Sequence, residues 1–244
     1  MKKKQILVTG STSGIGLNIC STLSELNASL IITGRNLNKL ESLSKQYRVN
    51  NINFSKYIHA DLINHLDIER LAEDSILLDG LVLNAGVIEY SPTKLISNEK
   101  INKIFKTNFE SNVLLIQNLL KRKKIKKGAS IVFISSIASN LGVKGTALYS
   151  ASKAALNAYA KVLANELSVQ QIRVNIILPG IVKTELIDRE NIATTQSIEK
   201  TENEYPFGFG LPEDITNLVL FLLSDKSRWI TGSEIVIDGG HSLK

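Results

Sequence analysis

Tyr149 and Lys153 lie four residues apart in the segment "ALYSASKAALNAYA", residues 147 to 160. On an α-helix, side chains at this spacing lie on the same face, one turn apart. A phenol has an ordinary pKa of about 10, and a nearby cation favours its deprotonated form. Such a pair can exchange a proton with a substrate oxygen at working pH. The same spacing also occurs on ordinary amphipathic helices, so the interpretation depends on what the rest of the chain places beside the pair.

The composition is that of a globular protein with ample material for a core. The chain has 244 residues, of which 43% are hydrophobic and 21% are charged. It contains four prolines and no Gly/Ser-rich or Pro-rich tract, so no linker is evident. We therefore expect a single domain over residues 1–244.

Cysteine usage and hydropathy indicate a protein of a reducing compartment. Cys20 is the single cysteine, which excludes an internal disulfide. The first ten residues, "MKKKQILVTG", contain only a short apolar run, and no apolar stretch has the length of a membrane span. We expect a cytoplasmic protein with no membrane association and no bound metal.

The net charge of +6 is concentrated partly in "KRKKIKK", residues 121 to 127. This run is interpreted as a solvated helix end and loop, where lysines suit the negative end of the preceding helix. The alternative is a docking patch for an acidic or phosphorylated partner. A nucleic-acid partner is not expected, because no recognition motif or aromatic platform accompanies the lysines.

Short apolar runs alternate with longer amphipathic stretches along the chain. The apolar runs predict buried strands at 5–10, 29–34, 56–61, 80–86, 130–136, 173–180 and 234–240. The amphipathic stretches predict helices at 14–27, 36–47, 65–74, 94–123, 147–168 and 212–224. This alternation predicts a doubly wound, Rossmann-type α/β domain, with a seven-stranded, mostly parallel sheet and helices on both faces.

Polar or glycine-rich residues end most of the predicted strands. They are Thr9-Gly10, Gly34-Arg35, Asp61, Asn84-Ala85-Gly86, Ser135-Ser136 and Pro179-Gly180. The carboxyl ends of parallel strands lie along one edge of the sheet, where doubly wound proteins bind their ligands. The site is therefore predicted at this edge.

A glycine turn, "TGSTSGIG", joins the first predicted strand to the first predicted helix. Gly10 allows a tight turn, Gly14 lets the backbone approach a pyrophosphate, and Gly16 permits close packing of helix on strand. The amide groups at the start of the helix favour phosphate charge. A turn of this kind can also serve packing alone, but its place between strand and helix predicts dinucleotide binding.

The end of the second predicted strand indicates which dinucleotide. Proteins that bind NAD usually carry Asp or Glu there to hold the ribose 2′-hydroxyl. Here Gly34 stands at that position and Arg35 follows it. A guanidinium suits a 2′-phosphate through charge and paired hydrogen bonds. We predict a preference for NADP(H), with NAD(H) as a possible second cofactor; the alternative is a surface arginine that starts a helix.

The chain resembles the short-chain dehydrogenase/reductase family over nearly its whole length, and within it the 3-oxoacyl-[acyl-carrier-protein] reductases. The resemblance rests on several motifs in family order, with Ser136 thirteen residues before Tyr149. They are "TGSTSGIG", "ADL" at 60–62, "NAG" at 84–86, Asn108, Ser136, "YSASK" at 149–153, "PGIVKT" at 179–184 and "ITGSEIVIDGG" at 230–240.

The resemblance implies a cofactor site and a catalytic tetrad. Asp61 would contact the adenine together with the backbone after it, residues 84–86 would line the adenine–ribose side, and Ile181 and Thr184 would lie near the nicotinamide amide. The implied cofactor residues are Gly10, Ser13, Gly14, Ile15, Gly16, Arg35, Asp61, Leu62, Asn84, Ala85, Gly86, Tyr149, Lys153, Pro179, Gly180, Ile181 and Thr184.

The implied tetrad is Asn108, Ser136, Tyr149 and Lys153. Tyr149 would transfer the proton, and Lys153 would favour the phenolate and hold the nicotinamide ribose. Ser136 would hydrogen-bond the substrate oxygen and stabilise its developing charge. Asn108 would hold a water that relays protons to Lys153.

Some of these assignments have nearby rivals. Ser135 and Asn112 are the neighbours that could be mistaken for Ser136 and Asn108, and an Asp such as Asp61 often caps a helix. The chain also departs from the commonest family text. Leu83 replaces a frequent Asn, Ser13 replaces a basic residue found in many NADP-dependent relatives, and residues 207–209 lack a usual arginine.

Three functions follow from these features. The first is an NADPH-dependent carbonyl reductase, or the reverse alcohol dehydrogenase, for a small or medium metabolite, with a lid at about 185–210. The second is a 3-oxoacyl-[acyl-carrier-protein] reductase, whose acidic partner basic patches would help; against it, Gln170 and Gln171 stand where a second basic docking residue would be expected. The third is a non-catalytic NADP-binding sensor or nucleic-acid-binding protein.

The long helices at 94–123 and 147–168 also imply a homo-oligomer, a tetramer or a dimer.

Overall fold

The seven predicted strands form one sheet in the computed structural model, which describes residues 1, 3–49, 54–185 and 198–243. The order is β3-β2-β1-β4-β5-β6-β7, and every neighbouring pair is parallel. The strands are β1 Gln5–Val8, β2 Ser29–Gly34, β3 Phe54–His59, β4 Leu78–Leu83, β5 Ile125–Ile134, β6 Arg173–Pro179 and β7 Glu234–Ile237. The predicted doubly wound α/β fold is confirmed.

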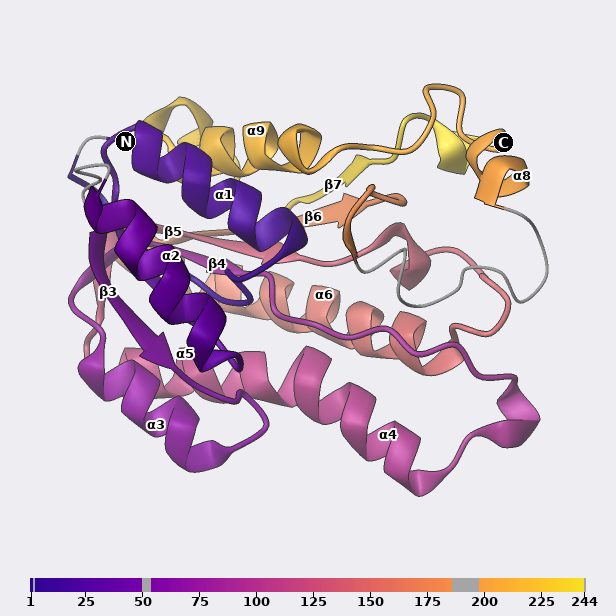
Figure 1. The fold of residues 1–244 in the computed structure, drawn as a ribbon, viewed down its shortest axis with the longest axis horizontal. Coiled ribbons are helices and arrows are strands. Elements are labelled where there is room, and N and C mark those ends of the chain that lie inside the picture. The colour runs from indigo at the N-terminus through magenta and orange to yellow at the C-terminus, as the bar shows by residue number, and fades with distance from the viewer. Residues whose placement is uncertain (2, 50–53, 186–197, 244) are drawn as a thin grey trace.

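Helices cover both faces of the sheet, as the sequence predicts (Figure 1). One face carries α1 Gly14–Glu25, α2 Leu37–Val49 and α9 Pro212–Leu223. The other carries α3 His65–Asp74, α4 Asn98–Phe105, α5 Ser111–Lys121 and α6 Ala147–Leu167. The short helix α8 Ile198–Glu202 lies beyond the sheet. Single 3-10 turns occur at Thr93–Leu95, Ile137–Ser139, Ser168–Gln170, Asp225–Ser227 and His241–Leu243.

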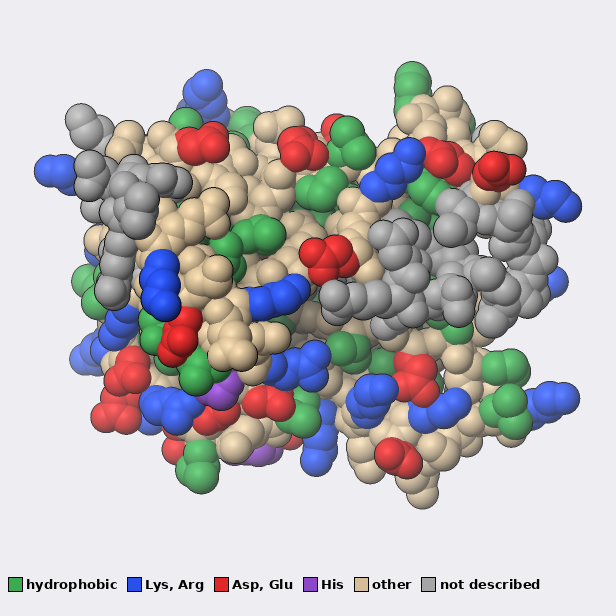
Figure 2. Space-filling model, in the orientation of Figure 1, with side chains coloured by type: hydrophobic (Ala, Val, Ile, Leu, Met, Phe, Trp, Pro, Cys, Tyr) green, Lys and Arg blue, Asp and Glu red, His purple; other side chains and the backbone are tan. Residues whose placement is uncertain are grey.

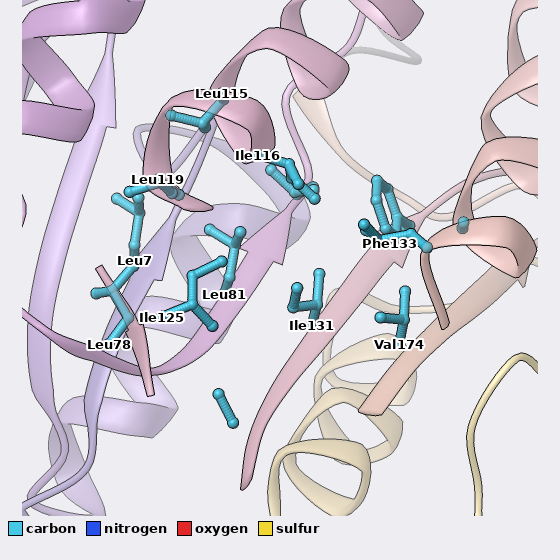
Figure 3. Packing of buried hydrophobic residues seen from close by; sticks show 14 of the residues in the cluster. Leu7, Leu78, Leu81, Leu115, Ile116, Leu119, Ile125, Ile131, Phe133 and Val174 are labelled. Carbon is cyan, nitrogen blue, oxygen red and sulfur yellow. The ribbon is translucent and has the colours of Figure 1, made fainter. Parts of the chain in front are cut away.

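Two separate hydrophobic layers hold the helices on the sheet. Strand side chains alternate between the faces, so that Leu7 and Ile31 pack towards α3, α5 and α6, while Ile6 and Ile32 pack towards α1, α2 and α9. Figure 3 shows α5 on the first layer, where its leucine and isoleucine side chains lie over those of the strands. A sheet buried on both faces explains why its strands are continuous apolar runs.

The predicted helix over 94–123 is wrong as a single element. A 3-10 turn at Thr93–Leu95 precedes α4, whose N-cap Ser97 accepts a hydrogen bond from the Lys100 amide. A π-helical segment, Lys106–Glu110, then separates α4 from α5. A π-helical turn contains one residue more than an α-helical turn. The spacing of hydrophobic residues continues through this segment, so the sequence alone does not reveal the additional residue.

The basic run at 121–127 covers the end of α5, a turn and the start of β5. Lys121 occupies the last turn of α5, and the Lys124 Nζ donates to the carbonyls of Glu73 and Ser75 at the end of α3. Lys126 forms an ion pair with Asp79. These contacts agree with lysines that stabilise helix ends, although the run enters the strand instead of ending in the loop.

This run lies at the amino edge of the sheet, whereas Ser136 follows the carboxyl end of the same strand. A ten-residue strand spans roughly 30 Å, so the lysines do not flank this chain's own Ser136. On the face shown in Figure 2, acidic and basic side chains are mixed and do not gather into one basic surface. Among the described helices, none is long and apolar enough to cross a bilayer.

The strand order reverses between β1 and β4, which is where this type of sheet opens a crevice for ligands. The segments after β4, β5 and β6 extend beyond the sheet on the same side, to the right in Figure 1. The topology therefore brings together the polar strand ends that the sequence singles out.

Candidate active site

The glycine turn after β1 has the backbone conformation that its sequence predicts. Gly10 and Gly14 have φ angles of +62° and +52°, which side chains other than glycine's rarely adopt. A Cβ on Gly16 would lie 2.2 Å from the Gly10 carbonyl oxygen, so this glycine allows the turn to fold closely against α1. Ser13 is the extended N-cap of α1, and Ile15 packs into the layer beneath it.

Thr9 and Asn84 fasten the glycine turn to the end of β4. The Thr9 hydroxyl accepts hydrogen bonds from the amides of Asn84 and Ala85, at 3.0 and 3.1 Å. The Asn84 side-chain amide donates to the carbonyls of Thr9 and Gly10. Asn84 thus shapes the turn from within the protein, and Thr9 is a structural partner that sequence reasoning missed.

Lys153 is buried on α6 beneath the carboxyl end of β5. Its side-chain ammonium donates to the Ile134 carbonyl at 2.8 Å. Burial lowers its pKa to about 8, because removing the amine from water disfavours its charged form. The Nζ lies 5.8 Å from the centre of the Tyr149 ring, so the helical spacing does bring the two side chains together.

Ser136, and not its neighbour Ser135, presents its hydroxyl at the carboxyl end of β5. The Ser136 Oγ accepts a hydrogen bond from the Ala138 amide and caps the 3-10 turn that follows. Its own hydrogen therefore remains available to a ligand oxygen. Ser135 is buried, and its Oγ has no hydrogen-bond partner among the described residues. The geometry favours Ser136, as the spacing to Tyr149 predicts.

Asn108 is fully buried in the π-helical segment. Its side chain both donates and accepts a hydrogen bond with the chain that follows β4. Its Oδ1 accepts from the Val87 amide, and its Nδ2 donates to the Val87 carbonyl, both at 2.8 Å. The same Nδ2 reaches Ser152, whose hydroxyl donates to the Tyr149 carbonyl. Asn112, the rival candidate, donates to the Asn108 carbonyl and supports it.

Gly86 leaves the space in which two of these groups meet. A Cβ at Gly86 would lie 3.3 Å from the Asn108 Oδ1 and 3.4 Å from the Lys153 Nζ. A larger residue would press on both groups. The "NAG" motif thus combines a structural Asn84 with a glycine that makes room for the buried amine.

The ends of β2 and β3 form the adenosine side of the predicted site. Arg35 is exposed and lines a shallow, open depression together with the next three residues, Asn36 to Asn38. A ring nitrogen of His59 contacts the Arg35 carbonyl at 3.0 Å. Asp61 accepts from the Ile63 amide and Asn64 caps α3, so Asp61 is not the helix cap; Leu62 is buried.

The segment after β6 contains Pro179, Gly180, Ile181 and Thr184. Pro179 ends β6 and Thr184 faces the glycine turn, with its Cγ2 3.2 Å from where a Cβ on Gly14 would stand. Both backbone groups of Ile181 are already used: its amide donates to the Tyr205 hydroxyl and its carbonyl accepts from Gly210. Both backbone groups of Ile181 thus have protein partners, and its place near the nicotinamide amide stays a prediction.

The backbone groups of Val182, the next residue, point to the opposite side from the Ile181 carbonyl. The Ile181 carbonyl and the Lys183 amide both bond Gly210. In a trans peptide the N–H and C=O point in opposite directions. The amide and carbonyl of Val182 therefore point away from Gly210.

These residues fit a bound dinucleotide. The turn between β1 and α1 leaves the first amides of the helix without intrahelical partners, as phosphate binding requires. Arg35 forms no ion pair with any described acidic residue, so its guanidinium is available to a further anion. Lys153 and Ser136 lie at the other end of the same sheet edge.

Part of the predicted lid, residues 186–197, lies outside the described residues. The flanking parts are tied to the rest of the molecule by ion pairs. Lys183 pairs with Glu202 of α8 at 2.8 Å, and Glu185 pairs with Lys39 of α2 at 3.7 Å. The second pair joins the segment after β6 to the helix that follows Arg35.

Comparison with known proteins gives full-length matches. A family model described as "Enoyl-(Acyl carrier protein) reductase" matches residues 10–242. The 3-oxoacyl-[acyl-carrier-protein] reductase FabG of Rickettsia felis is 34% identical over 97% of this chain and 96% of its own. The L-xylulose reductase of Caenorhabditis elegans is 34% identical over 98% and 96%.

Solved structures give the same result. A short chain dehydrogenase family protein from Francisella tularensis has a TM-score of 0.84 and 31% identity, over 99% of this chain and all of its own. A 4-hydroxyisoleucine dehydrogenase mutant, solved with NADH and succinate, has a TM-score of 0.88 and 31% identity, over 99% of both chains.

The burial of Lys153 predicts a pH dependence of stability. The pKa of about 8 in the folded chain lies below the usual 10.5, so the unfolded chain binds more protons between these values and stability rises with pH. We expect Lys153→Met to be more stable than the wild type below pH 8, by about 3 kcal/mol at most, and this difference to shrink towards pH 10.5. Urea unfolding across pH 7 to 10.5 measures it.

Lys45→Met on the exposed side of α2 is the control, and its stability relative to the wild type should not change over this pH range. If the free energies of unfolding of the wild type and Lys153→Met differ by the same amount from pH 8 to 10.5, burial of the charged Lys153 amine does not destabilise the fold as predicted.

Proposed function

The chain belongs to the short-chain dehydrogenase/reductase family, and we propose that it is an NADPH-dependent oxidoreductase that interconverts a carbonyl compound and a secondary alcohol of small or medium size. The observation that carries the proposal is the buried Lys153 amine beside the Tyr149 ring, at the strand end that leads to Ser136. The nicotinamide supplies the hydride when bound. This chain's residues must bind the substrate, supply the proton and stabilise charge.

Tyr149 is the proton donor in the direction of reduction. Addition of hydride to a carbonyl carbon leaves negative charge on the oxygen, which must receive a proton. The phenol loses its proton more readily beside the Lys153 ammonium, which stabilises the phenolate that remains. In the direction of oxidation the same phenolate takes the alcohol proton.

Ser136 orients the substrate oxygen. Its Oγ already accepts from the Ala138 amide, so the hydroxyl hydrogen is the group left to donate. A donor fixed in place before the reaction stabilises developing negative charge without reorganisation. Asn108 keeps its proposed role in holding a water for proton relay to Lys153. Its side chain is occupied by Val87, so the water would bond its backbone carbonyl, beside the Asn112 contact.

Substitutions at the tetrad test the reaction. We expect Tyr149→Phe to lower kcat by about 10² to 10⁴-fold, because the proton donor is lost. Ser136→Ala should lower kcat by about 10² to 10³-fold, because a charge-stabilising donor is lost. The matched control is Ser135→Ala, whose buried hydroxyl makes no described hydrogen bond and whose loss should leave kcat unchanged. Steady-state reduction of a ketone panel, followed at the nicotinamide absorbance, measures all three.

Full activity in Tyr149→Phe would contradict the assignment. NADPH binding without turnover of any carbonyl or alcohol, in wild type and variant alike, would instead favour the non-catalytic sensor.

NADP(H) is the proposed cofactor because the end of β2 carries a guanidinium, on Arg35, and no carboxylate. Arg35 is exposed beside the depression at the start of α2 and forms no described ion pair. Gly34 stands where NAD-binding proteins usually carry an acid, and a Cβ there would lie 3.0 Å from the Thr12 Cγ2.

Removal of the Arg35 guanidinium should therefore act on one cofactor. We expect Arg35→Ala to raise the KM for NADPH by about 10- to 100-fold, because charge-assisted hydrogen bonds to the 2′-phosphate are lost. The KM for NADH, which lacks that phosphate, should stay nearly unchanged. Lys45→Ala, which removes a different exposed cation of α2, should alter neither KM. A wild type that prefers NADH, or a variant that loses both cofactors equally, would contradict the NADP assignment.

The second candidate is a 3-oxoacyl-[acyl-carrier-protein] reductase. The Rickettsia relatives with this name favour it, but the L-xylulose reductase of Caenorhabditis elegans is as similar to this chain. The lysines at 121–127 lie at the amino edge of the sheet, and Gln170 and Gln171 add no charge there. On one chain, these residues provide no basic surface beside Ser136.

Turnover of acetoacetyl-[acyl-carrier protein] against the same acetoacetyl group on a short thioester separates the two functions. We expect kcat/KM for the two substrates to agree within about threefold, because the lysines at 121–127 lie at the opposite edge of the sheet from Ser136. The triple variant Lys121→Gln/Lys123→Gln/Lys127→Gln should not change this ratio. A preference of 100-fold or more for the protein-bound substrate, lost in the triple variant, would establish the second candidate.

We also propose a homo-oligomer, a dimer or tetramer, formed through α6. Four alanines of this helix, Ala147, Ala151, Ala154 and Ala158, are exposed at spacings of three and four, so they form one continuous small-residue face. Val162 extends this face and is 57% exposed. Such a face allows a helix of a second copy to approach closely.

A further inference from the structure

Tyr205 is a buried tyrosine between α8 and α9, and its hydroxyl contacts the segment that follows β6. Only 5% of its surface is exposed, and its oxygen accepts a hydrogen bond of 3.2 Å from the Ile181 amide. Burial raises its pKa to about 12, so the hydroxyl is neutral at working pH. Neither the motifs nor the catalytic roles proposed above use this residue.

The Tyr205 ring is fixed on several sides. It stacks on the His241 ring of the C-terminal turn, with centroids 4.1 Å apart and planes 10° from parallel. Its centroid lies 5.2 Å from that of Phe209 in an edge-to-face arrangement. A Cβ at Gly180 would lie 2.8 Å from the Tyr205 Cε1, so the ring rests directly on the Gly180 backbone. The hydroxyl therefore has a defined position.

The Tyr205 hydroxyl fixes the Gly180–Ile181 peptide, and Gly210 fixes the two peptide groups on either side of Val182. With its amide bonded to Tyr205 and its carbonyl bonded to Gly210, Ile181 cannot rotate without loss of a hydrogen bond. The trans geometry then directs the Val182 amide and carbonyl to the opposite side. Thr184, two residues later, faces the glycine turn at Gly14, which places this strand along the proposed cofactor site.

We propose that Tyr205 is a positioning residue for the nicotinamide half of the cofactor, acting through the Ile181 peptide on Val182. The proposal rests on the proposed function, since it requires that a nicotinamide dinucleotide binds along this edge. It assigns no contact between Tyr205 and the cofactor. It further makes the C-terminal turn at His241 part of the support for cofactor binding.

A comparison of the whole cofactor with its adenosine half tests this role. NADPH contains the nicotinamide, and 2′,5′-ADP contains only the adenosine part with the 2′-phosphate. We expect Tyr205→Phe to raise the Kd for NADPH about threefold to tenfold, because one hydrogen bond is lost. The Kd for 2′,5′-ADP should stay unchanged. Calorimetric titration measures both, and the fluorescence of bound NADPH, which reports the nicotinamide environment, should change as well.

Two further variants make the result specific. Tyr47→Phe removes another buried phenol oxygen, on α2, and should alter neither Kd. His241→Ala keeps the Tyr205 hydroxyl but removes the ring stacked on it, and should weaken NADPH binding selectively by a smaller factor.

An unchanged Kd for NADPH in Tyr205→Phe overturns the inference. An equal loss of NADPH and 2′,5′-ADP binding also overturns it, because that result describes a general structural role. If the wild type binds neither NADPH nor NADH, both the proposed function and this inference fail. Normal wild-type binding with no effect of Tyr205→Phe removes the inference alone.

Discussion

The burial of the Lys153 amine is the constraint on which the arrangement of the site depends. A charged amine removed from water is costly unless a polar partner compensates it. Here the partner is the Ile134 carbonyl, the last of β5, so the length of that strand fixes where the charge lies. The α6 helix then places Tyr149 one turn away, with its ring 5.8 Å from the Nζ. Ser136 follows the same strand end, so one strand positions both the charge and the hydroxyl.

The elements around this amine make room for it and hold its surroundings rigid. Gly86 leaves space beside the Nζ that any larger side chain would fill. Asn108, placed by the π-helical segment, bonds both backbone groups of Val87 and so holds the chain that follows Gly86. Ser152 joins that network to the carbonyl of Tyr149. Three elements far apart in the sequence are thereby fixed relative to one another by groups that are themselves buried.

Local sequence signals predict much of this arrangement, and long-range contacts account for the rest. The strand positions follow from apolar runs, and the glycine turn from its place between strand and helix. Periodicity does not reveal the π-helical segment, because the apolar pattern of 94–123 continues through it. The contribution of Tyr205 depends on a partner 24 residues away, Ile181, and on a ring from the C-terminal turn. The resemblance names Ile181, and the pairing with Gly210 shows that the Val182 amide and carbonyl point to the opposite side.

In the proposed reaction, this edge of the sheet holds a nicotinamide and a carbonyl so that hydride passes between them. Reduction of a ketone panel with NADPH deuterated on one face of the nicotinamide C4 tests it most directly, with mass spectrometry of the alcohol product. The account predicts one deuterium per alcohol molecule from one of the two faces and none from the other. NADPH oxidation that leaves no deuterium in the product from either face would contradict it.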